Sequence, residues 1–173
     1  MSTLPKEMKA FSRWLGAGPT AVVAEVLNAA ARLRAPFEAA GFRLVDKTFD
    51  SSGAPAHSLN LEREGLPGDT DYVVITFDKR RDLRFQVIFG SKETRPPHKW
   101  VKSGALVRKA GSELDKHKWW GATWWSFDKR KALASATDEV VSLVPQALHF
   151  LATGEAGKNV HSVDLATSRR GPA

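Results

Sequence analysis

Apolar and polar residues recur with two different periods along the chain, and the period predicts where helices and strands lie. Near the N-terminus the apolar positions have the spacing of a short amphipathic helix: Leu4, Met8, Phe11 and Leu15. A second helix is expected from Thr20, which can cap it, to Gly41, which can close it. Pro36 lies inside this pattern and should break or kink the helix.

The C-terminal half predicts one long helix followed by a tail. This helix should begin after Ser126 or Asp128, either of which can cap it, and end at Gly154. Pro145 should kink or divide it. From residue 155 the composition is rich in Gly, Ser, Arg and small residues. We therefore expect a single domain over residues 1–154 and a flexible tail over residues 155–173.

Between these helices the apolar positions alternate with a period of two, which is typical of strands. Strand-like segments cover residues 42–50 and 58–62, and a short extended piece is possible near 105–108. The two clearest strands cover residues 71–77 and 83–89, and the short connection between them predicts an antiparallel hairpin. The pattern predicts an α+β fold: an antiparallel meander sheet of four to five strands, packed by the N-terminal helices and the long C-terminal helix.

Composition narrows the classes of protein and of chemistry. A chain of 173 residues that is 42% hydrophobic has the size and core of one globular domain. It contains no cysteine, which excludes disulfides, thiolate zinc sites and cysteine nucleophiles. No segment approaches the roughly 18 consecutive apolar residues of a membrane span, and the N-terminus has no apolar signal region. We expect a cytoplasmic protein that does not interact with membranes.

The positive charge is concentrated in one segment. Residues 91–131 contain eleven Lys or Arg and four acidic residues, and this excess equals the whole net charge of +7. The remaining residues balance, so the segment predicts a basic face that could engage an anionic partner. A solvated surface without a partner would also explain such a charge excess.

Two tryptophan pairs lie inside this segment, where residues 116–131 read KHKWWGATWWSFDKRK. If residues 119–127 form a strand, one face carries Trp119, Trp125 and Phe127, and we expect that face in the core. The other face carries Trp120 and Trp124, which could lie under the last helix or be exposed among lysines. Exposed tryptophans beside basic residues suit single-stranded nucleic acid, and they equally suit an acidic protein such as a cognate toxin or effector.

The sequence therefore predicts a non-enzymatic binding domain without a cofactor. The residues expected to contact the anionic partner are Lys99, Lys102, Arg108, Lys109, Lys116, Lys118, Trp120, Trp124 and Lys131.

Four stretches together resemble a bacterial family known as domain of unknown function number 4304. They are AAGFRLVDKTFD, DYVVITFDKR, LRFQVIFGSKE and the late tryptophans that precede a long helix. The resemblance covers about residues 22–151. It implies a small α+β domain and supplies no catalytic residues.

Catalytic motifs are few. The five histidines are scattered without metal-ligand spacing, and the sequence has no nucleophile elbow, phosphate-binding loop or dinucleotide fingerprint. One enzymatic alternative is a metal-dependent nuclease, in which carboxylates at hairpin ends hold magnesium and an arginine assists. Its residues would be Asp69, Asp71, Asp82 and Arg84. Hairpin turns also favour Asp for purely local reasons.

Overall fold

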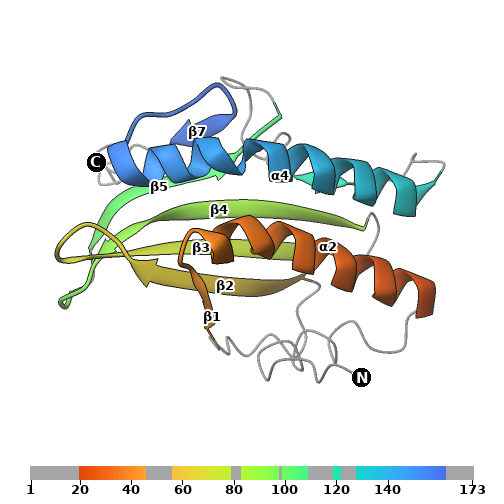
Figure 1. The fold of residues 1–173 in the computed structure, drawn as a ribbon, viewed down its shortest axis with the longest axis horizontal. Coiled ribbons are helices and arrows are strands. Elements are labelled where there is room, and N and C mark those ends of the chain that lie inside the picture. The colour runs from red at the N-terminus through yellow and green to blue at the C-terminus, as the bar shows by residue number, and fades with distance from the viewer. Residues whose placement is uncertain are drawn as a thin grey trace, which may run out of the picture.

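A computed structural model describes residues 20–45, 56–78, 83–97, 99–108, 119–121 and 128–162. The helix expected over residues 4–15 lies outside this part of the chain. The described residues have an α+β fold with two helices and seven strands (Figure 1). In chain order these are α2 (Thr20–Ala39), β1 (Arg43–Val45), β2 (Ala56–Glu64), β3 (Asp69–Asp78), β4 (Arg84–Glu93), β5 (Trp100–Leu106), β6 (Trp120–Gly121), α4 (Lys129–Thr153) and β7 (Val160–Ser162).

The strands form one antiparallel sheet in the order β1-β2-β3-β4-β5-β7, and β6 pairs separately with β4. The predicted hairpin is confirmed: β3 and β4 pair along their whole length, with Val73 opposite Phe89 and Phe77 opposite Phe85. These four side chains are buried and share one face, as their alternation indicates. The sheet has more strands than the four to five expected.

One added strand lies in the segment that the sequence analysis assigned to a flexible tail. Residues 160–162 form β7, which pairs with Gly104–Leu106 of β5, so the expectation of a tail is wrong for residues 155–162. Two contacts hold this segment. Val160 is buried in the core, and the Asn159 amide donates to the carbonyl of Val107 at 3.0 Å. Residues 163–173 lie outside the described part of the chain.

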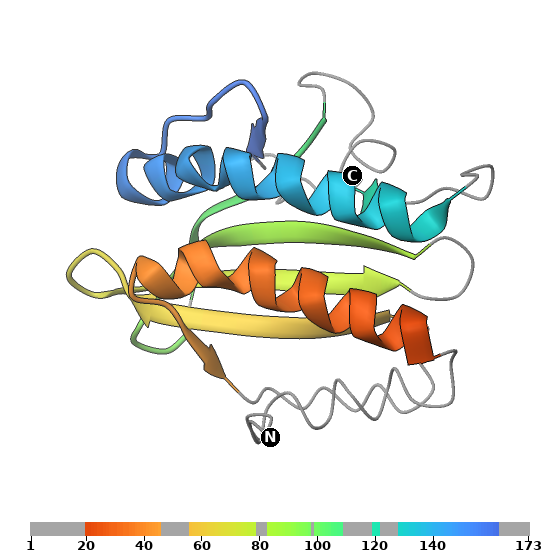
Figure 2. The ribbon, with the colours of Figure 1, turned by 45° about the vertical axis from the view of Figure 1, so that its right-hand side comes forward.

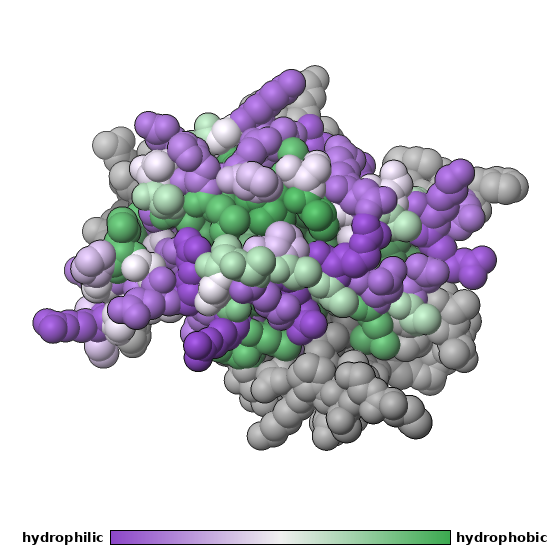
Figure 3. All heavy atoms as spheres, viewed as in Figure 1, coloured by the Kyte–Doolittle hydropathy of each residue, from purple (hydrophilic) through white to green (hydrophobic). Residues whose placement is uncertain are grey.

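Both helices cover the same face of the sheet and run side by side in the same direction, from the right to the left of Figure 1; Figure 2 shows the same layering from another angle. An ion pair between Arg32 of α2 and Asp138 of α4 joins them. Below it, the buried faces of the helices pack on the sheet through Leu33, Phe37, Val140 and others. Figure 3, drawn from the helix side, shows an apolar band between α2 and α4 with polar residues around it.

The helix ends follow the predicted capping residues. Asp128 caps α4 by accepting hydrogen bonds from two backbone N–H groups of the first turn, and Gly154 closes the helix with φ 81°. Neither proline ends its helix: α2 continues past Pro36 to Ala39, and α4 continues past Pro145 to Thr153. Pro145 has no backbone N–H to donate to the carbonyl four residues earlier. Because Pro145 is exposed, water can bind that carbonyl instead.

The tryptophans of β6 correct the predicted assignment of faces. Trp120 is fully buried, and its indole N–H donates to the carbonyl of Leu106 at 3.3 Å. Trp119 is only partly buried, and the guanidinium of Arg84 lies 4.5 Å from its ring centroid. The register explains this, because Trp120 pairs with Phe85, whose side chain faces the helices. Trp120 is therefore a core residue and not a binding residue; Trp124, Trp125 and Phe127 lie outside the described residues.

We predict that Trp120→Ala lowers the free energy of unfolding by about 3 to 5 kcal/mol, because it leaves a large cavity and an unpaired carbonyl. Trp119→Ala is the matched control and should cost clearly less, since its ring is partly solvated. Urea denaturation of both variants measures the difference. Equal losses would contradict the assignment of the two faces.

Candidate functional site

The basic residues predicted to form one face do not converge. Lys102 donates a hydrogen bond to the carbonyl of Leu151 near the end of α4, whereas Lys131 lies in the first turn of the same helix. About 20 residues of helix separate these two positions, or about 30 Å. Lys99 precedes β5 and Arg108 follows it, again about 30 Å apart. The expected single face is wrong for these four residues. Lys99 and Arg108 lie at opposite ends of β5, and Lys102 and Lys131 lie at opposite ends of α4. Lys109, Lys116 and Lys118 lie outside the described residues.

The residues of the nuclease alternative are not assembled either. Asp69 and Asp71 lie at the start of β3, whereas Arg84 pairs with Asp78 at its other end, at 3.2 Å. Seven residues of strand place Asp71 and Asp78 about 23 Å apart. Asp82 lies outside the described residues, and within the described ranges no group of three His, Asp or Glu side chains could hold a metal ion.

Asp71 instead belongs to a row of polar residues that crosses four strands on the face under the helices. The register places Arg63, Asp71, Ser91 and Lys102 opposite one another on β2, β3, β4 and β5. Arg63 binds one carboxylate oxygen of Asp71 through Nε and Nη2, each at 3.0 Å, and the Ser91 hydroxyl donates to the other oxygen. Asp71 is 3% exposed, so its carboxylate is buried. Both carboxylate oxygens accept hydrogen bonds, as a buried charge requires.

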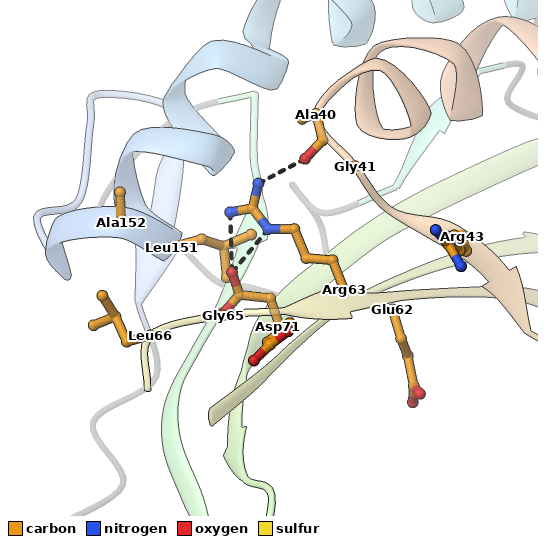
Figure 4. Close-up of a pocket in the computed structure, with 11 residues that line it drawn as sticks. Ala40, Gly41, Arg43, Glu62, Arg63, Gly65, Leu66, Asp71, Leu151 and Ala152 are labelled. Atoms are coloured by element: carbon orange, nitrogen blue, oxygen red, sulfur yellow. Dashed lines mark hydrogen bonds and ion pairs between the residues drawn. The ribbon is translucent and has the colours of Figure 1, made fainter. Parts of the chain in front are cut away.

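The two cations of this row also bind the C-terminal ends of both helices. Arg63 donates through Nη1 to the carbonyl of Ala40 just after α2, at 3.0 Å, and Lys102 donates to Leu151 of α4. Figure 4 shows Arg63 reaching from β2 toward Ala40 and Asp71, beside a cavity of about 690 Å³. Each helix end carries about half a negative charge, which the cations compensate. We interpret this cluster as the anchor that fixes both helices on the sheet.

The opposite face of the sheet carries a second cavity, of about 570 Å³, between β2 and β5. Its walls include Asn60, Tyr72, Lys92 and Trp100. Trp100 is 47% exposed, and its ring lies edge to face with Tyr72 at a centroid distance of 4.7 Å. The ammonium of Lys92 lies 3.9 Å from the centroid of Trp100 and 5.4 Å from that of Tyr72. This cluster of two rings and one cation is a partly open aromatic surface with a charge fixed beside it.

A β-bulge places Trp100 on this face. Lys102 pairs with Ser91 and Trp100 pairs with Lys92, so Val101 is an extra residue on β5. In regular alternation Trp100 would share the helix-covered face with Lys102. The extra residue reverses the alternation and brings Trp100 next to Lys92. Trp100 was not among the predicted binding residues, although its position between Lys99 and Lys102 repeats the lysine and tryptophan pattern of residues 116–131.

Tyr72 forms the floor of the aromatic cluster. Its ring lies over Gly90 of β4, where a Cβ atom would stand 2.1 Å from the Tyr72 hydroxyl. The hydroxyl donates to Ser103 at 3.5 Å. Burial raises the pKa of Tyr72 to about 12, although the bond to Ser103 acts in the opposite direction. The hydroxyl is therefore neutral at physiological pH.

Asn60 lies at the β2 side of the same cavity. It is 9% exposed, and its side-chain amide makes no hydrogen bond with any described residue. Buried amides normally have partners, since leaving one unpaired is destabilising. Its amide opens onto the cavity, where water can satisfy it, and it is not a buried unpaired group.

Comparisons with family models, curated proteins and solved structures found no match for this chain. The resemblance to domain of unknown function number 4304 therefore stays a prediction. Among the described residues, neither helix is long and apolar enough to cross a membrane.

Tyr72 is the only tyrosine in the chain, so its ionisation can be followed by the ultraviolet absorbance of phenolate. We expect a midpoint near pH 12 in the folded protein, against about 10 for an exposed tyrosine. Because the unfolded chain releases this proton first, the free energy of unfolding should fall as pH rises from about 10 to 12. A midpoint near 10 in folded protein would show that the ring is not covered.

Deletion of Val101 tests the role of the bulge. Without the extra residue, Trp100 should turn toward the helix-covered face and leave Tyr72 uncovered. The titration midpoint of Tyr72 should then move from about 12 toward 10. Val101→Ala keeps the bulge and should retain the high midpoint. An unchanged midpoint in the folded deletion variant would refute this account.

Proposed function

We propose that the protein binds single-stranded nucleic acid on the open face of its sheet, without catalysis. The observation that carries this proposal is the exposed Trp100 ring, held by Tyr72 and flanked by the ammonium of Lys92. An exposed aromatic ring offers a platform on which a base can stack, and one such contact contributes about 1 to 3 kcal/mol. A cation fixed beside the ring is placed to bind the adjacent phosphate.

The charges around the ring support a strand that follows the β5 side of the face. The end of β4 and the connection to β5 carry Lys92, Arg95 and Lys99 and one acid, Glu93. On the other side of the cavity, Glu62 of β2 would repel a phosphate. The backbone of a bound strand should therefore lie along β5, and its bases should point toward the cavity.

The geometry favours a single strand over a duplex and over an acidic protein. The bases of a duplex are stacked and paired, whereas a base in a single strand is free to stack on Trp100 and enter a cavity. The described lysines and arginines of the predicted face divide between two ends of the molecule, so they do not form one broad basic surface for an acidic protein. Binding of an acidic protein in place of an oligonucleotide would therefore contradict the proposal.

Trp100→Ala should weaken the binding of a short single-stranded oligonucleotide by about tenfold, measured by fluorescence anisotropy at low salt. Leu66→Ala is the matched control, because Leu66 is 54% exposed but lines the cavity on the helix side. For about three phosphate contacts, log affinity should fall with log salt at a slope near −2. If no oligonucleotide binds at low salt, or an acidic protein binds instead, the proposal is wrong.

A further inference from the structure

A second pair of a tryptophan and a cation lies on the open face, near the start of β4. The guanidinium of Arg84 lies 4.5 Å from the ring centroid of Trp119. The side chains of Arg84 and Lys92 point to the same face of the sheet, because an even number of residues of β4 separates them. The pair therefore repeats, at one end of β4, the contact that Lys92 makes with Trp100 at the other end.

Both tryptophans lie on the same side of β4. β3 pairs with one side of β4 along its whole length, and β5 and β6 share the other side. Trp100 is opposite Lys92, and the register of β6, continued by one residue, puts Trp119 opposite Gln86. Six residues of strand separate these two positions, or about 20 Å. The two tryptophans therefore lie on one line along the open face.

Resting on the proposed function, we infer that Trp119 and Arg84 form a second stacking site for the same single strand. Bases stack on the plane of a guanidinium as they do on aromatic rings, and the side chain of Arg84 is 35% exposed. Two contacts hold this guanidinium: the ring of Trp119, and Asp78, which accepts hydrogen bonds from Nε and Nη2 at 3.4 and 3.2 Å. A base that stacks here meets a plane already held in position, which lowers the entropic cost of binding.

The separation of the two sites sets the length of the bound strand. Phosphates in a stacked strand are about 3.4 Å apart, so a span of about 20 Å corresponds to about six nucleotide steps. A strand that is stretched between the sites needs fewer steps, about three. Two bases about three to six steps apart can therefore occupy both sites at once. Binding at the second site then raises the affinity without any new contact at Trp100.

The test uses strands of about twelve nucleotides in which two positions carry thymine and every other position is abasic. All strands have the same number of phosphates, so only the spacing between the two bases differs. Fluorescence anisotropy with the full-length protein should show a maximum of affinity when the thymines are about three to six steps apart. Binding there should be about tenfold tighter than for adjacent thymines, which can occupy only one site.

Trp119→Ala should remove the dependence on spacing and leave the affinity for adjacent thymines within about twofold of the wild-type value. Trp119→Phe keeps an aromatic ring and is the matched control, which should retain the dependence. Arg84→Lys serves as a second variant if Trp119→Ala does not fold. It keeps a cation beside Asp78 and removes the planar guanidinium, so it should also lose most of the dependence.

Equal affinity of the wild-type protein at every spacing would overturn the inference and leave binding at Trp100 intact. A dependence on spacing that persists in folded Trp119→Ala and Arg84→Lys variants would overturn the role of this pair. Absence of binding to an all-thymine strand of the same length would instead overturn the proposed function.

Discussion

The carboxylate of Asp71 is the contact on which the arrangement of sheet and helices depends. It is buried and charged, so it requires partners, and Arg63 and Ser91 supply them from the neighbouring strands. Arg63 in turn reaches the end of α2, and Lys102, in the same row, reaches the end of α4. Two parallel helices place two negative ends at one side of the molecule, and this row neutralises them there. The anchor thus ties the C-terminal ends of both helices to one face of the sheet.

The open face is built from the same strands as the anchor, by residues next to the anchor residues in the sequence. Ser91 belongs to the anchor and its neighbour Lys92 belongs to the aromatic cluster, as alternation along a strand requires. On β5 the bulge at Val101 separates Lys102 from Trp100 in the same way, although the two are only two positions apart. The strands can therefore serve a charged anchor on one face and an aromatic surface on the other.

The sequence predicted the fold better than the site, for physical reasons that particular residues show. Alternation identified β3 and β4, and capping chemistry identified Asp128 and Gly154, because these signals are local. The burial of Trp120 depends on pairing with a distant strand, and a strand of two residues has too little pattern to reveal its register. The bulge that exposes Trp100 likewise depends on the pairing of β5 with β4, which no single segment encodes. Lys102 was assigned to a partner outside the chain, whereas it binds the end of a helix within it.

The aromatic cluster requires glycine at position 90, and this predicts how related sequences can vary. A Cβ atom at this position would lie 2.1 Å from the hydroxyl of Tyr72 and 2.3 Å from the carbonyl of Lys102. No other residue fits while the Tyr72 ring crosses β4 and β5 pairs this closely. Diverged copies of this domain that keep the aromatic floor must therefore keep glycine at position 90 as well. If either Tyr72 or Gly90 is replaced during evolution, the other residue is no longer constrained. Positions 72 and 90 should therefore covary.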